Sequence, residues 1–259
     1  MECKNCQHRQ DDPFKFCPIC GAKVIHNRLT LKNLAEDIAL NVFDIDNSFA
    51  RTFRELFSHP DQVIDNYIQG IRKRYMNPIG YFGIAITLSG ILLLLMRRFF
   101  RDRIDFDIYG QGANPEVMNK VMNIMFDLNT LIFIIYVPIF AISGWLSFNR
   151  KSYNLTEYSV FYMYILAQWS IILFPISLAT LFVSPENYLV LGIPLLIALV
   201  IYSIYAMQRL NRFTTSQLML KIPIFSILVT IGYFGFIMVF YAVLFLTGIL
   251  TLSDFAPVQ

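Results

Sequence analysis

All four cysteines of this 259-residue sequence lie among its first twenty residues, in two pairs of identical spacing. Cys3 and Cys6 form one C-x2-C pair, Cys17 and Cys20 form the other, and ten residues lie between the pairs. Each pair offers two thiolates from one tight turn, and two such turns build the four-sulfur tetrahedral site typical of structural zinc. Four cysteine ligands leave no open coordination position for water or a substrate. We therefore predict one structural Zn²⁺ ion and no catalytic metal.

Two other cysteine chemistries fit this spacing less well. A pair of disulfides is typical of small secreted modules, but the sequence begins with polar residues and shows no signal peptide. A redox C-x-x-C motif is disfavoured because the pair is duplicated and no strand–helix–strand pattern surrounds it. Acidic residues nearly balance the basic ones here, which disfavours nucleic acid as a partner. We predict a zinc ribbon over residues 1–26, with Phe14 and Phe16 in its core.

The rest of the chain has the composition of a membrane protein. Hydrophobic residues make up 56% of the sequence and charged residues 15%, and the mean hydropathy is +0.53. These values fit several membrane spans beside a smaller polar part. The fold class is therefore mainly α: a polytopic helical membrane protein with a small N-terminal ribbon. Uncharged runs long enough to cross the hydrocarbon core predict five spans, at about 78–96, 129–148, 158–183, 188–207 and 222–252.

The sequence predicts four consecutive parts. The ribbon of residues 1–26 precedes cytoplasmic amphipathic or interfacial helices over 27–77, because apolar residues recur every three or four positions within 29–58. A transmembrane domain then occupies 78–252, and a short tail of residues 253–259 ends the sequence.

The distribution of basic residues predicts the orientation of the chain. Basic residues before the first predicted span, after the second and between the fourth and fifth place the head in the cytoplasm. The loop 97–128 also carries five basic residues and would lie outside, against this rule. A re-entrant 78–96 gives the same balance of charges, so charge leaves both topologies open. Its nineteen residues favour a true span.

A second candidate site lies where the polar part meets the first span. A helix starting near Pro60 has one apolar stripe, and we expect Arg72, Lys73 and Arg74 to close it, where positive charge suits the C-terminal dipole. Pro78 then forces a break before the first span. We expect the stripe to enter the headgroup boundary and the three basic residues to contact anionic lipid headgroups. The alternative is that these charges only set the orientation of the first span.

The same region carries a family resemblance. The run Phe-Arg-Glu-Leu-Phe-Ser-His-Pro at 53–60 is followed by Val63-Ile64, Tyr67-Ile68, Gly70, Arg72-Lys73-Arg74-Tyr75, Asn77-Pro78 and Tyr81-Phe82. This pattern resembles an uncharacterised bacterial family, domain-of-unknown-function family 3667 (DUF3667), whose members have a similar N-terminal zinc-ribbon pair. Gln7 here follows the first cysteine pair where a glycine is usual. The resemblance implies a location in a bacterial inner membrane and implies no activity. A weaker likeness is to Yip-type membrane adaptors.

The predicted spans hold few groups that could do chemistry. No Asp, Glu, Lys, Arg or His lies centrally in any span, which disfavours an ion-coupled transporter or a membrane enzyme. The polar candidates are Gln168, Ser226 and Thr230, for which hydrogen bonding between helices is a commoner role than ligand binding. We therefore predict a non-enzymatic membrane adaptor whose head binds a protein partner or a second copy of the chain. The alternative is a transporter or handler of small solutes or lipids.

Overall fold

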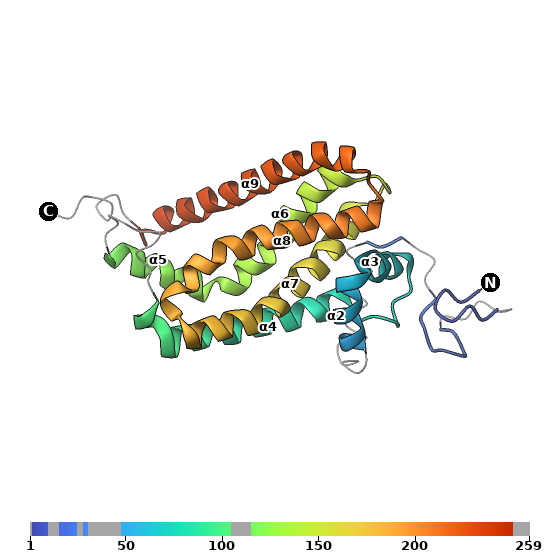
Figure 1. Ribbon diagram of the computed structural model, residues 1–259, viewed down its shortest axis with the longest axis horizontal. Helices are drawn as coiled ribbons and strands as arrows, with labels where there is room; N and C mark the ends of the chain where they lie inside the picture. Colours follow the sequence, from blue (N-terminus) through green and yellow to red (C-terminus); the bar gives the residue numbers. More distant parts are fainter. Residues whose placement is uncertain (1, 10–15, 25–27, 31–47, 105–114, 251–259) are drawn as a thin grey trace.

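Cysteine loops, two short helices and a bundle of long helices follow one another in the computed structural model, which describes residues 2–9, 16–24, 28–30, 48–104 and 115–250 (Figure 1). Within these ranges β structure is limited to two isolated bridges, Glu2–Arg9 and Phe16–Lys23. The α-helices are α2 (Ser48–Ser58), α3 (Pro60–Gln69), α4 (Pro78–Leu95), α5 (Pro115–Asp127), α6 (Asn129–Phe148), α7 (Leu155–Val183), α8 (Tyr188–Asn211) and α9 (Thr215–Leu246).

The long helices confirm the predicted fold class and the number of spans. Five segments are long and apolar enough to cross a membrane: Pro78–Phe100, Asn129–Phe148, Leu155–Val183, Pro185–Asn211 and Thr215–Leu246. The chain is therefore a multi-pass helical membrane protein.

Polar capping residues move two of the helix starts away from the predicted positions. α7 begins at Leu155 because Asn154 and Glu157 form a reciprocal capping box, with hydrogen bonds of 2.8 and 2.7 Å. α9 begins at Thr215 because Thr214 and Gln217 form another. Hydropathy does not mark such caps, so the predicted fifth span, 222–252, starts within α9. It ends beyond α9, because apolar residues continue in the sequence after Leu246.

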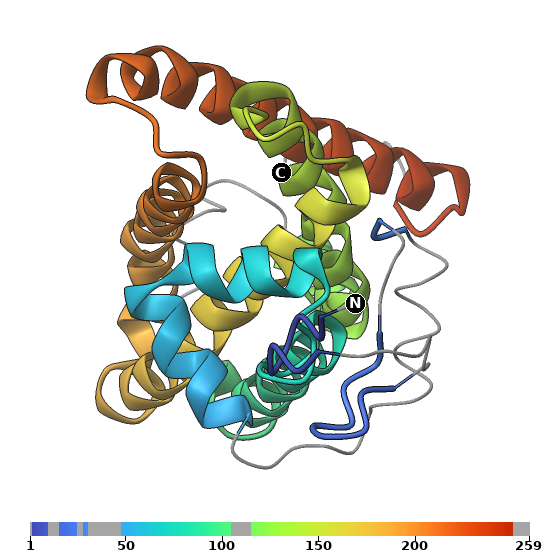
Figure 2. The ribbon, with the colours of Figure 1, turned by 90° about the vertical axis from the view of Figure 1, so that its right-hand side faces the viewer.

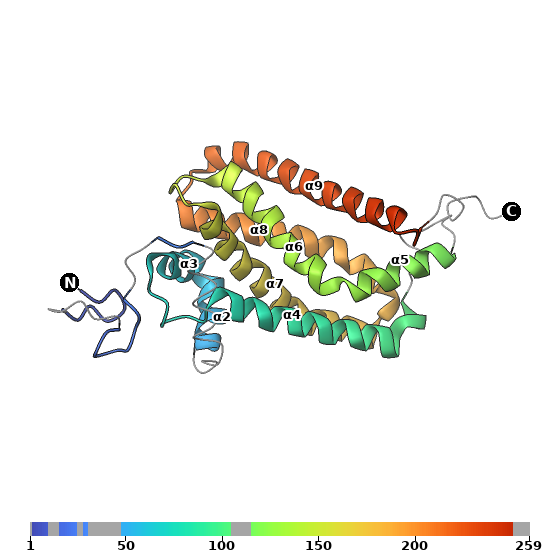
Figure 3. The ribbon, with the colours of Figure 1, turned by 180° about the vertical axis from the view of Figure 1, so that it is seen from behind.

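The first long helix crosses the whole bundle. α4 starts beside the cysteine loops, at what we call the head end, and runs to the opposite far end, where α5 lies (Figures 1 and 3). This continuous helix favours the predicted true span over the re-entrant alternative for 78–96, which would turn back within the bundle. At the far end, Arg97 pairs with Asp127 at 2.8 Å, which neutralises part of the positive charge of the loop 97–128.

α7 lies at the centre of the bundle and α9 at its edge. α7 packs against α4, α6 and α8, and its first half also contacts α2 and α3. The fully buried side chains of the protein concentrate in that half, and they include Tyr158, Phe161, Tyr162, Tyr164 and Ile165. α9 packs mainly on α6 and leaves most of its apolar surface exposed, as a lipid-facing helix does (Figure 1).

Two short helices cover the head end of the bundle. α2 and α3 lie across it in Figure 2, which views the molecule from that end. The Tyr202 hydroxyl of α8 donates to the carbonyl of Leu56 at 3.0 Å, and Arg209 donates to the carbonyl of Ser58 at 3.1 Å. The amphipathic pattern predicted for 29–58 is thus confirmed for α2, whereas residues 31–47 lie outside the described residues.

α3 buries its apolar stripe inside the protein. Val63, Ile64 and Tyr67 are 0–1% exposed and pack in the core formed with α7 and α8. The prediction that this stripe enters the headgroup boundary is therefore wrong for these three residues. The helix stops at Gly70, whose φ of 101° is accessible chiefly to glycine, so the basic triplet follows the helix and does not close it.

Candidate metal centre

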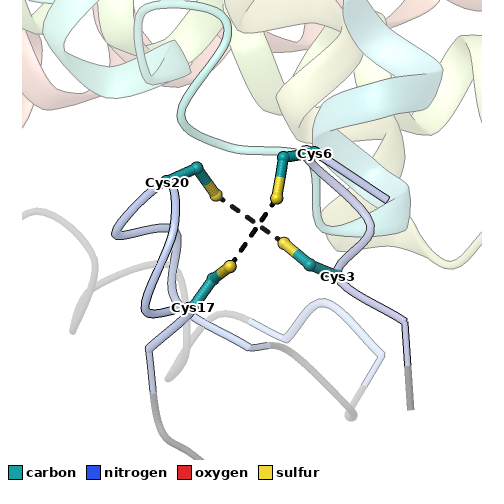
Figure 4. Close-up of side chains that lie close together, drawn as sticks. All are labelled: Cys3, Cys6, Cys17 and Cys20. Carbon is teal, nitrogen blue, oxygen red and sulfur yellow. Dashed lines mark hydrogen bonds between the residues drawn. The ribbon is translucent and has the colours of Figure 1, made fainter. Parts of the chain in front are cut away.

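The four cysteine sulfur atoms converge at the head (Figure 4). All four Sγ atoms lie within 4.8 Å of one another; Cys3 and Cys20 are 3.7 Å apart, and Cys6 and Cys17 are 3.6 Å apart. Metal–sulfur bonds of about 2.3 Å in a tetrahedron place the sulfur atoms about 3.8 Å apart. A disulfide needs about 2.05 Å. The four thiols therefore fit one tetrahedral metal ion, and the two-disulfide alternative does not match this geometry.

The two cysteine loops repeat the same backbone hydrogen bonds. The amide of Gln7 donates to the carbonyl of Cys3 at 2.7 Å, and that of Gly21 donates to Cys17 at 2.8 Å. Both residues after the second cysteine have positive φ, 60° for Gln7 and 65° for Gly21. Glycine adopts this conformation without steric cost, whereas glutamine does not. The departure from glycine at position 7 is therefore a point of backbone strain in the first loop.

We expect Gln7→Gly to strengthen metal retention. Relief of a left-handed conformation in a residue with a Cβ is worth about 1 kcal/mol, or roughly fivefold in metal affinity where folding and binding are coupled. Gly21→Ala should act in the opposite direction, because its new Cβ adds strain and would lie 3.2 Å from Lys73 Nζ. Titration with a chelator measures both, and equal retention in the two variants would contradict the strain argument.

Backbone amides favour ionisation of one thiol. The N–H groups of Cys20 and Ile19 lower the pKa of Cys17 to about 6. Metals bind the thiolate and not the thiol, so these amides favour the form of Cys17 that a metal binds.

The core predicted for the ribbon differs from the one observed. Phe16 was expected to pack inside the ribbon, but it is 54% exposed, so that prediction is wrong. The buried cluster of the described head consists of Cys3, Cys17 and Ala22, with Cys20 against it. Because the described head buries so few apolar side chains, we expect metal binding to supply most of its stability. Phe14 lies outside the described residues.

Basic residues fasten the head to the start of the bundle. Lys73 Nζ donates to the carbonyl of Cys20 at 2.5 Å, and Lys4 Nζ donates to the carbonyl of Gln69 at 3.0 Å. The two predicted sites, the cysteine cluster and the basic triplet, are therefore in direct contact. No signal in the sequence predicted this contact, because 53 residues separate Lys73 from Cys20.

The other two residues of the basic triplet also contact the protein. Arg72 lies over the ring of Tyr67 at 5.2 Å, and Arg74 pairs with Glu55 at 3.8 Å. These contacts give the triplet a role within the protein. Its binding to lipid headgroups stays a prediction.

An ion pair that the sequence did not predict attaches residues 28–30, which follow the predicted ribbon, to α7. Arg28 donates to both carboxylate oxygens of Glu157, at 2.9 and 2.7 Å, and Glu157 is 2% exposed. Asn154 Nδ2 donates to the carbonyl of Leu29 at 3.0 Å. Residues 28–30 are thereby held against the start of α7. The only local signal was the Asn154-x-x-Glu157 capping motif.

Of the polar residues predicted within the spans, Gln168 acts as a link between helices. Its side chain is fully buried, accepts a hydrogen bond from the Tyr81 hydroxyl of α4, and donates to the carbonyl of Phe53 of α2 at 3.1 Å. Ser226 is half-buried and Thr230 is exposed on α9, at the edge of the bundle. The structure does not gather the three residues into one site.

The fold and the cysteine cluster define a multi-pass helical membrane protein with four clustered thiols, able to hold a metal ion, on a small head. Residues 46–90, which include α2, α3 and most of α4, match the model of the family described as "Protein of unknown function (DUF3667)". This match confirms the family resemblance predicted from the sequence. No curated protein and no solved structure matches the chain. The weaker likeness to Yip-type adaptors has no support.

Proposed function

We propose that the chain is a non-enzymatic membrane adaptor whose zinc-loaded cytoplasmic head binds a protein partner. The observation that carries this proposal is the exposure of two large apolar side chains on the second cysteine loop: Phe16 is 54% exposed and Ile19 is 68% exposed. A metal-ordered loop that presents apolar side chains to solvent is typical of a protein-binding surface. Zinc is the metal we assign, because four thiolates at tetrahedral spacing are its usual structural ligands.

The attachment of the head supports an adaptor role. Lys73 and Lys4 join the cysteine loops to the α3–α4 junction, and Arg28 joins the following segment to α7. The loop with Phe16 and Ile19 is therefore held at a defined place relative to the membrane spans. We place the head in the cytoplasm of a bacterial inner membrane, as the basic residues at this end of the spans predict.

Affinity capture from native membranes tests the proposal. The full-length chain should retain a stoichiometric protein partner, and the double variant Phe16→Ser/Ile19→Ser should lose it while retaining its metal. His8→Ser is the matched control, because His8 is an exposed polar residue that follows the first cysteine pair. Equal capture by the double variant and the wild-type chain would exclude this surface as the partner site.

One observation favours the alternative, a transporter or handler of small solutes or lipids. Five buried polar atoms on α6, α7 and α8 make no hydrogen bond of normal geometry with a described residue: Ser147 Oγ, Tyr158 Oη, Tyr162 Oη, Ser203 Oγ and Asn211 Oδ1. Tyr158 still interacts with Asn211, and Tyr162 with Ser203, so these four groups are incompletely satisfied and not isolated. Buried polar groups usually have partners, so water or a solute hydroxyl would satisfy these atoms. Experimental density for a solute or lipid between these helices in a nanodisc-embedded chain would support transport over the adaptor role.

A further inference from the structure

Two cations from different parts of the chain lie over one aromatic ring at the head end. Phe213, in the connection between α8 and α9, is 7% exposed. The Arg150 guanidinium lies 6.0 Å from its ring centroid, and the Lys221 ammonium lies 5.0 Å from it. Arg150 also donates to the carbonyl of Arg212 at 3.2 Å. Three basic residues from two interhelical connections and α9 are thereby brought close together.

Hydrogen bonds hold these cations at the ends of helices. Lys221 Nζ donates to the carbonyl of Ser147 at 2.7 Å, in the last turn of α6. Arg150 Nη1 contacts the carbonyl of Asn211 at 3.5 Å, where α8 ends. Cations are favoured at such C-terminal carbonyls. Their positions are therefore set by the fold, which lowers the entropic cost of using them to bind an anion.

The positive charge of this cluster is not neutralised within the described part of the chain. Neighbouring cations are paired: Lys151 with Asp65 at 2.6 Å, and Arg209 with Asp61 at 3.5 Å. Arg150, Arg212 and Lys221, in contrast, form no ion pair with a described carboxylate. The acidic residues of α3 thus neutralise the cations that face α2 and α3. The charges of Arg150 and Lys221 remain over Phe213, and the exposed Arg212 precedes Phe213 in the chain.

The surrounding side chains place this cluster at the level of lipid headgroups. Trp145, a residue type enriched at membrane interfaces, is 39% exposed on the last turns of α6. Beside it Leu146 is 57% exposed, and on α9 Met219 and Leu220 are 72% and 74% exposed. Acyl chains can therefore cover α6 and α9 immediately below the three cations.

We propose that Arg150, Arg212 and Lys221, arranged around Phe213, bind the phosphate group of an anionic phospholipid in the leaflet at the head end. The guanidinium and ammonium groups supply charge and hydrogen bonds to the phosphate, and the exposed surface of α6 and α9 receives the acyl chains. This site goes beyond the adaptor function, since it requires membrane insertion and no protein partner. It also lies apart from Arg72–Arg74, of which Arg74 is paired with the Glu55 carboxylate.

Native mass spectrometry of the full-length chain in an equimolar mixture of phosphatidylglycerol and phosphatidylcholine tests the site. The wild-type chain should retain phosphatidylglycerol preferentially. Arg212→Gln should lower this preference about fivefold, and Arg150→Gln/Arg212→Gln/Lys221→Gln should abolish it. Arg212→Gln is included in case the triple variant does not fold. We expect this single variant to fold normally, because the exposed Arg212 side chain makes no hydrogen bond or ion pair with a described residue.

A matched triple variant, Arg98→Gln/Arg101→Gln/Arg103→Gln, removes the same charge at the far end and should keep the preference. An undiminished preference in both head-end variants would overturn the site, as would an equal loss in the far-end control. Glycerol 3-phosphate in solution separates the two sources of phosphate. If it displaces the lipid at concentrations comparable to the lipid's own, the site binds soluble phosphate esters and the lipid assignment is wrong.

Discussion

Replacement of Cys17 by serine is expected to empty the metal site and to unfold the head while the helical bundle remains intact. Metal binding supplies most of the folding free energy of small four-thiolate modules, with apparent values of roughly 10–16 kcal/mol in zinc-finger peptides. The described head buries only Cys3, Cys17 and Ala22, so few other interactions oppose unfolding. The bundle has its own core around α7 and does not depend on these contacts.

Metal analysis and limited proteolysis together measure this result. The purified wild-type chain should contain about one zinc ion, and Cys17→Ser should contain far less. Protease should cleave the head of the variant rapidly, whereas its helical circular dichroism should stay close to that of the wild type. Pro18→Ala, an exposed neighbour that is no ligand, should keep the metal. Full metal content in Cys17→Ser would show that the four thiols are not the ligand set.

Residue spacing and hydropathy were enough to predict the cysteine cluster and the five candidate spans of this protein. The spacing of four cysteines is enough to predict a shared metal, and runs of uncharged apolar residues are enough to predict five spans. The helix starts at Leu155 and Thr215 were missed because they depend on polar caps outside the apolar runs. A hydropathy pattern carries little information about such caps.

Contacts between distant segments could not be predicted in this way. The stripe of α3 shows that one helix face is apolar, but the same pattern is compatible with burial in lipid or in protein. Its partners are tyrosines and apolar residues of α7 and α8 that follow about a hundred residues later. Likewise, the chain carries 21 lysines and arginines, and only the fold decides that Lys73 reaches Cys20 while Arg150 and Lys221 reach Phe213.

The second large effect is expected at Glu157, which joins the segment after the ribbon to the central helix. Its buried carboxylate accepts from Arg28 and from the amide of Asn154, at 2.7 Å in each case. Glu157→Ala removes both the ion pair and half of the capping box. Because a lost cap alone costs about 1 kcal/mol and the buried ion pair is lost with it, the variant should be destabilised by more than the cap alone.

A matched variant separates the two contributions. Glutamine can still accept from the Asn154 amide, so Glu157→Gln keeps the capping box. It loses the charge interaction with Arg28 and also the oxygen that accepts from Arg28 Nε, because an amide NH2 group takes its place. Its destabilisation should be smaller than that of Glu157→Ala, and Arg28→Met should add little to it, because the two residues act through one contact. Thermal unfolding in one detergent, with Arg54→Met as an exposed arginine control, measures the series. If Glu157→Ala unfolds at the wild-type temperature, the ion pair does not hold residues 28–30 on α7. If Arg28→Met and Glu157→Gln are fully additive, the two side chains stabilise the protein independently and the contact carries no coupling energy.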